Sequence, residues 1–121
     1  MPGVNENVAI EKLRRAAAGL PHVEEGTSYG TPALKVRKKL LARIKDADTV
    51  VLPCPLDEKE MLLSAAPDIF FETDHYKGWP AILVRIHAIS DDELRHRLER
   101  AWRMQAPKRL AAAFDAGSGS A

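Results

Sequence analysis

Three segments between residues 33 and 53 constrain the fold most, because their residue patterns are those of strands and so few residues separate them. They are Ala33–Val36, Leu40–Lys45 and Thr49–Pro53. The first two alternate apolar and polar residues, which predicts strands with one face toward a core. Connections this short cannot hold the crossover that parallel strands need. The sequence therefore predicts an antiparallel sheet built from consecutive hairpins.

The loop of the first hairpin follows from the rule that opposed residues point to the same face of a sheet. A two-residue turn at Lys38-Lys39 would oppose Leu34 to Arg43 and mix the faces. A three-residue loop, Arg37–Lys39, opposes Leu34 to Ala42 instead. We therefore expect the three-residue loop. The buried face would then hold Leu34, Val36, Leu40, Ala42 and Ile44, and Leu41 would point outward with the cations.

Helices are expected before, between and after the strands. Helical spacing of apolar residues predicts the first over about Glu6 to Ala18. A short second helix begins at Asp57 and ends before Pro67. Ser90 and Glu93 form a capping box at the start of a last long helix, which Pro107 interrupts. A further short helical piece is expected over residues 108–114.

The remaining strands complete the predicted order. They are expected at His22–Gly30, Ile69–Glu72 and Ala81–Ala88. The order α-β-β-β-β-α-β-β-α predicts an α+β fold, a two-layer domain in which helices cover one face of a mainly antiparallel sheet. We expect one domain over residues 1–116 and a flexible tail over residues 117–121.

Composition limits the chemistry that the chain can carry. Cys54 is the only cysteine, so neither an internal disulfide nor a cysteine-rich zinc site can form. The four histidines lack metal-ligand spacing, and there is no phosphate-binding glycine loop. No apolar run is long enough to cross a bilayer, and the first residues do not resemble a signal peptide. We expect a cytoplasmic protein without metal, cofactor or membrane partner.

The formal net charge is only +1, so any charged interface must come from local clustering. Six cations lie within residues 35–45, with no acidic residue among them. They are Lys35, Arg37, Lys38, Lys39, Arg43 and Lys45. Arg85 is expected to join their outward face if its strand lies in the same sheet. Such a surface can contact phosphates, although lysines on an exposed hairpin also serve simply to block unwanted strand pairing.

A second candidate site is the turn-rich segment 74–80. Asp74, His75, Tyr76 and Trp79 bring a carboxylate, an imidazole, a phenol and an indole into one turn. With Tyr29, they would form a small-ligand pocket if their side chains converge. The alternative is a rigid turn, in which the carboxylate bonds nearby amides and the aromatic residues pack.

Three stretches in this order resemble the MmcQ/YjbR-like family of small bacterial proteins. They are LPHVEEGTSYGTPA at 20–33, FFETDHYKGWP at 70–80 and AWRMQAPKR at 101–109. The resemblance covers about residues 6–112 and implies a two-layer fold similar to frataxin-like and secretion-chaperone-like domains. It also implies a DNA-binding, double-wing role and no catalytic residues. Because the first helix mixes acidic with basic residues, a frataxin-like iron function is not expected.

Three functions follow as hypotheses. The first is a non-enzymatic module that binds DNA through the basic hairpin and the outward sheet face. The second is a protein-interaction or chaperone-like domain, in which Leu41 and Leu83 form an apolar patch on that face. The third is a small-ligand site around Tyr29, His75 and Trp79. The oligomeric state does not follow from the sequence.

Overall fold

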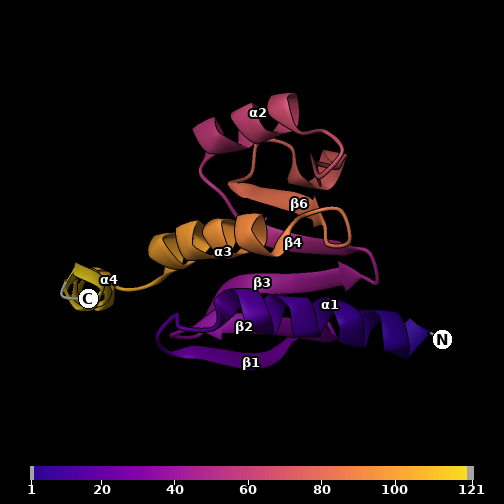
Figure 1. Ribbon diagram of the computed structural model, residues 1–121. Coiled ribbons are helices and arrows are strands. Elements are labelled where there is room, and N and C mark those ends of the chain that lie inside the picture. Colours follow the sequence, from indigo (N-terminus) through magenta and orange to yellow (C-terminus); the bar gives the residue numbers. More distant parts are fainter. Residues whose placement is uncertain (1, 120–121) are drawn as a thin grey trace.

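The structure, a computed structural model, describes the backbone of residues 2–119 and the side chains of residues 8–116. The described chain has four helices, one short 3-10 helix and six strands, and Figure 1 shows how they are arranged. The helices are α1 (Pro2–Ala17), α2 (Leu56–Ala65), η1 (Asp74–Tyr76), α3 (Asp91–Gln105) and α4 (Lys108–Gly119). The strands are β1 (Val23–Ser28), β2 (Thr31–Val36), β3 (Lys39–Asp46), β4 (Thr49–Pro53), β5 (Phe70–Phe71) and β6 (Ala81–Arg85).

The six strands form one open sheet in the order β1-β2-β3-β4-β6-β5. Every pair of neighbouring strands is antiparallel. The predicted α+β class and antiparallel sheet are therefore confirmed, as is the order of the elements up to α3. None of the helices in the described part of the chain combines the length and the apolar composition that a membrane span requires.

Helices α1 and α3 lie across the same face of the sheet (Figure 1). Their apolar sides pack on the core-facing residues of β2, β3, β4 and β6. Trp102 of α3 is fully buried, and its indole N–H donates to the Pro21 carbonyl oxygen at 3.0 Å. Ser90 caps α3 as predicted, because its hydroxyl accepts from the Glu93 amide at 3.1 Å.

The hairpin between β2 and β3 differs from the prediction. Its turn has two residues, Arg37 and Lys38, with φ of 51° and 72°, so Val36 opposes Lys39 instead of Leu40. Positive φ at both positions is typical of a type I′ turn, which matches the twist of the strands. The predicted three-residue loop is therefore wrong.

A bulge on β3 restores the alternation that the short turn would otherwise disrupt. Lys35 opposes Leu40 and Leu34 opposes Ala42, so Leu41 is an extra residue on β3. Leu41 is fully buried in the core, whereas Leu40 is only partly buried and turns to the other face. The predicted sides of Leu40 and Leu41 are therefore exchanged.

The second face of the sheet, called here the open face, carries none of these helices. One row of cross-strand neighbours crosses it in the order Ala33, Arg43, Val51, Leu83 and Phe71. Leu83 is fully buried within this row. With Leu41 in the core and Leu83 covered, the apolar patch expected from these two residues does not form.

Candidate functional site

An open groove of about 870 Å³ lies on the open face. Its floor comes from β3, β4 and the start of β6, and its wall from the segment 73–80. The lining residues are Tyr29, Leu40, Arg43, Lys45, Val51, Pro53, Thr73, His75, Tyr76, Trp79, Pro80, Ala81 and Gln105. They include two cations and four aromatic or imidazole rings but no carboxylate. The groove therefore suits a ligand that carries negative charge and a flat ring.

Two aromatic side chains of the groove are largely exposed. Tyr29 is 91% exposed and Trp79 is 63% exposed. Tyr29 has φ of 53° and, with Gly30, forms the tight turn between β1 and β2. Large aromatic side chains gain more by burial than by contact with water. Two exposed rings on one groove are therefore available for stacking on a ligand.

A buried lysine holds the wall of the groove in place. Lys59 of α2 is 3% exposed, and its ammonium donates to the carbonyl oxygens of Tyr76 at 2.7 Å and Trp79 at 2.9 Å. Its Nζ also lies 3.5 Å from the Glu72 carboxylate. Gly78 supplies the positive φ of 80° that the turn needs. The wall is thus fixed from α2, on the side away from the groove.

Arg43 occupies the middle of the groove. Its guanidinium donates to the Tyr76 hydroxyl at 2.6 Å and lies 5.3 Å from the centre of the Tyr29 ring. These contacts orient the side chain but leave its charge in place. Within the described residues, no carboxylate lies within 4.0 Å of Arg43, so the charge is available to an anion.

The other predicted cations surround the groove or lie at the hairpin tip. Lys45 lines the groove, and Lys35 shares the open face with Leu40. Arg85 stacks over the Phe71 ring at 4.2 Å, beyond the groove. Arg37, Lys38 and Lys39 are exposed at the hairpin tip. Among residues 8–116, none of these six has an ion-pair partner.

The structure brings together most of the residues predicted for a ligand pocket. Tyr29, His75, Tyr76 and Trp79 all line the groove, and the His75 and Tyr76 rings meet edge to face at 5.0 Å. Asp74 is exposed on η1 and does not line it.

Sequence reasoning did not find three residues that shape the groove. Leu40 reaches it only because of the bulge on β3. Gln105 reaches it from the end of α3 and donates to the Leu40 carbonyl oxygen at 2.8 Å. Lys59 lies in the charged run Asp57–Glu60, which gives no sign that one of its side chains is buried.

Comparison with known proteins places this fold in a family. A model of the YjbR family matches residues 18–104, which include all six strands and most of α3. The chain belongs to the YjbR family. This confirms the resemblance seen in the three sequence stretches.

Uncharacterised proteins of Mycobacterium tuberculosis and Mycobacterium bovis are each 44% identical to this chain over 61 residues. The aligned segment covers 50% of this chain and 47% of the relative, so the chain spans about half the length of the curated relatives it matches. The crystal structure of Deinococcus radiodurans protein DR2400, with the family domain DUF419, superposes with a TM-score of 0.70 at 17% identity. That match covers 88% of this chain and 87% of the other and shows a shared fold.

Proposed function

We propose that this YjbR domain binds DNA, without catalysing a reaction, through the open face and the hairpin tip. The observation that carries the proposal is the set of seven cations without carboxylate partners among the described residues. They are Lys35, Arg37, Lys38, Lys39, Arg43, Lys45 and Arg85. Unpaired cations gathered on one surface release counterions when they meet phosphates, which is the main source of sequence-independent affinity for DNA.

The hairpin turn supports this proposal through its backbone. Arg37 and Lys38 both adopt positive φ, which costs a non-glycine residue roughly 1 kcal/mol or more. Asn-Gly would make the same turn with less strain. Strained backbone at a projecting tip is typical of positions chosen for their side chains. The turn therefore carries two cations at positions where the residues that best suit its backbone, Asn and Gly, are neutral.

The groove lining supports a binding role over an enzymatic one. It holds no cysteine and no carboxylate, so a nucleophile with its base cannot be built there from those groups. His75 lines the groove, but its ring has no hydrogen-bond partner among the described residues. Because Leu41 is buried and Leu83 covered, a docking role through that apolar patch loses its support as well.

Fluorescence anisotropy with a labelled duplex tests the proposal. If about four phosphates are contacted, raising salt from about 50 to about 200 mM should weaken binding about a hundredfold. Lys38→Glu together with Lys39→Glu should weaken binding at the lower salt at least tenfold and reduce the salt slope by about two. Absence of duplex binding at about 50 mM salt and tens of micromolar protein would reject the proposal.

A matched control separates the hairpin from charge in general. Lys108→Glu with Arg109→Glu makes the same change in net charge on α4, where both residues are exposed. Binding by this control should stay within about twofold of the parent protein, because α4 is part of neither the open face nor the hairpin tip. Equal losses in the two double variants would mean that net charge alone is responsible.

A further inference from the structure

We propose that the groove on the open face takes an unpaired nucleotide of a single strand, with its base stacked on Trp79 and Tyr29. This inference rests on the proposed function and names the form of nucleic acid that the groove receives. It requires three properties on one surface: rings free for stacking, a cation free for a phosphate, and a rigid wall.

The rings are available because most of their surface is exposed. Trp79 is 63% exposed and Tyr29 is 91% exposed, whereas Trp102, the other tryptophan, is fully buried in the core. Tyr29 also adopts a left-handed conformation that favours glycine or asparagine. Every base, whatever the sequence of the strand, has a flat face that can stack on such rings. In a duplex both faces of each base are already covered by its neighbours, so only an unpaired base can use them.

The cation is free because the groove contains no acidic group. Arg43 is oriented by the Tyr76 hydroxyl and the Tyr29 ring, and Lys45 lies two residues further along the same face of β3. A phosphate at these two residues would lie beside a base on Tyr29, since Arg43 is 5.3 Å from that ring. Ring and cation are thus neighbours, as a nucleotide requires.

The wall is rigid because Lys59 fixes it from behind. Its two hydrogen bonds go to the backbone of Tyr76 and Trp79, the residues that carry the groove's phenol and indole. The backbone that carries both rings is therefore held in position before a ligand arrives, which reduces the ordering that binding must impose. Lys59 acts as a positioning residue and does not itself line the groove.

Intrinsic fluorescence provides a direct test, because only one of the two tryptophans is exposed. Titration with an unlabelled oligonucleotide of about ten residues should quench the emission of Trp79 and leave that of Trp102 unchanged. In Trp79→Ala the quenching should disappear and single-strand affinity should fall about tenfold or more. Trp79→Phe should recover part of that affinity, since a smaller ring still stacks.

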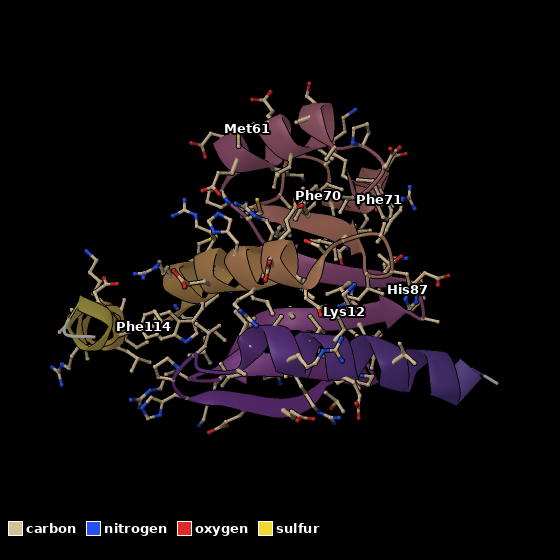
Figure 2. All side chains as sticks on the ribbon, in the orientation of Figure 1. Lys12, Met61, Phe70, Phe71, His87 and Phe114 are labelled. Atoms are coloured by element: carbon tan, nitrogen blue, oxygen red, sulfur yellow. The ribbon has the colours of Figure 1, made fainter. Side chains whose placement is uncertain are left out.

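Controls decide between this inference and its alternatives. Met61→Ala removes an exposed apolar side chain from the outer side of α2 (Figure 2) and should leave affinity unchanged. A free 5′-mononucleotide that binds as tightly as the oligonucleotide would overturn the single-strand proposal in favour of a small-ligand site. Single-strand binding that Trp79→Ala does not weaken would also overturn it.

The two proposals fail in different ways. If duplex binding depends on Lys38 and Lys39 but no groove variant affects single strands, the DNA-binding proposal stands and the groove inference falls. If single strands quench Trp79 while the hairpin variants bind duplex normally, the groove inference stands and the role of the hairpin tip falls.

Discussion

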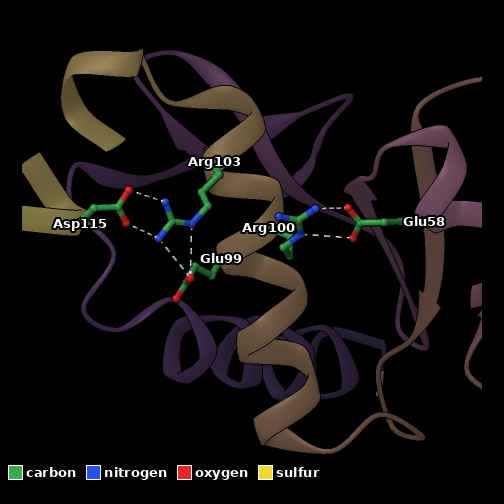
Figure 3. A network of polar contacts seen from close by, with 5 residues as sticks. All are labelled: Glu58, Glu99, Arg100, Arg103 and Asp115. Carbon is green, nitrogen blue, oxygen red and sulfur yellow. Dashed lines mark hydrogen bonds and ion pairs between the residues drawn. The ribbon is translucent and has the colours of Figure 1, made fainter. Parts of the chain in front are cut away.

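The cations of α3 and those of the open face differ in whether a carboxylate pairs with them. On α3, Arg97 and Arg100 both donate to the Glu58 carboxylate of α2. Arg103 bridges Glu99 and Asp115, and Figure 3 shows this bridge together with the contact between Arg100 and Glu58. On the open face, Arg43 contacts only a phenol and an aromatic ring among the described residues. The acidic groups Glu58, Glu99 and Asp115 thus hold the arginines of α3, whereas Glu24, which opposes Lys35 in the sheet, forms no ion pair among the described residues.

The overall charge of the chain does not reveal this difference between the two regions. The sequence has 18 basic and 17 acidic residues, which suggests no charged surface. Two further ion pairs involve arginines of α1, namely Arg14 with Glu25 and Arg15 with Asp91. Arg95, Lys108 and Arg109 are unpaired among the described residues, but they lie on helices and do not cluster as the open-face residues do. The distribution of acids therefore produces a basic surface on a nearly neutral protein.

The largest effect is expected at the buried cation. Lys59→Met would leave the nearby Glu72 carboxylate and two carbonyl groups without their partner. Breaking a buried ion pair in this way costs about 3–5 kcal/mol of unfolding free energy. Urea denaturation measures it, with Lys77→Met, at an exposed lysine of the groove wall, as the control. A loss below about 1 kcal/mol would contradict the assigned role of Lys59.

A smaller loss is expected where α2 meets α3. Glu58→Gln removes the charge that Arg97 and Arg100 share. Hydrogen bonds to charged groups contribute about 1.5–3 kcal/mol each, and the amide retains part of them, so we expect a loss of about 2 kcal/mol. Glu60→Gln, an exposed position on α2, is the control. DNA affinity should not change in either variant, and a reduced affinity in Glu58→Gln would break the separation between the two regions.

The same carboxylate predicts a pH dependence. Hydrogen bonds from Arg100 lower the pKa of Glu58 from its usual 4.5; partial burial opposes this shift, and Arg97 adds to it. The stabilisation is therefore present above pH 4.5 and is lost as the pH falls through the lowered pKa. Denaturation at several pH values should show the gap between parent and Glu58→Gln narrowing below about pH 4.5. A gap that stays constant into acid would show that Glu58 is not the titrating group.

The smallest effect on stability is expected on the open face. Lys45→Ser removes an exposed cation that has no carboxylate partner among the described residues. Substitutions at such sites usually change the unfolding free energy by less than about 0.5 kcal/mol. DNA affinity should nevertheless fall several-fold, because one phosphate contact is lost. A marked loss of stability would show that Lys45 serves the fold instead of a ligand.

Local signals in the sequence predicted much of the fold. The Ser90 cap of α3, the strand at Ala81 and the consecutive hairpins depend on neighbours in sequence, and the structure has all three. The bulge at Leu41 could not be predicted, because neither Arg37 nor Lys38 is a residue type that favours positive φ. Whether residues 117–121 form a flexible tail stays a prediction, although α4 continues to Gly119.

The groove was predictable only in part. The aromatic residues at 29 and 75–79 are conspicuous in the sequence, and the alternation of β3 placed Arg43 and Lys45 on one face. Their meeting depends on the pairing of β4 with β6, which carries the segment 73–80 over the sheet. The role of Lys59 could not be predicted either, because its hydrogen-bond partners lie 17 and 20 residues away in the sequence.

The extra residue at Leu41 makes the hairpin tolerant of a deletion at this one position. Lys35 already opposes Leu40 and Leu34 already opposes Ala42, so removing Leu41 would leave a regular ladder with both pairs and both faces unchanged. The core would lose one fully buried leucine side chain. A homologue one residue shorter here would therefore keep the groove and every cation in place, and the change would be felt in the packing of the core.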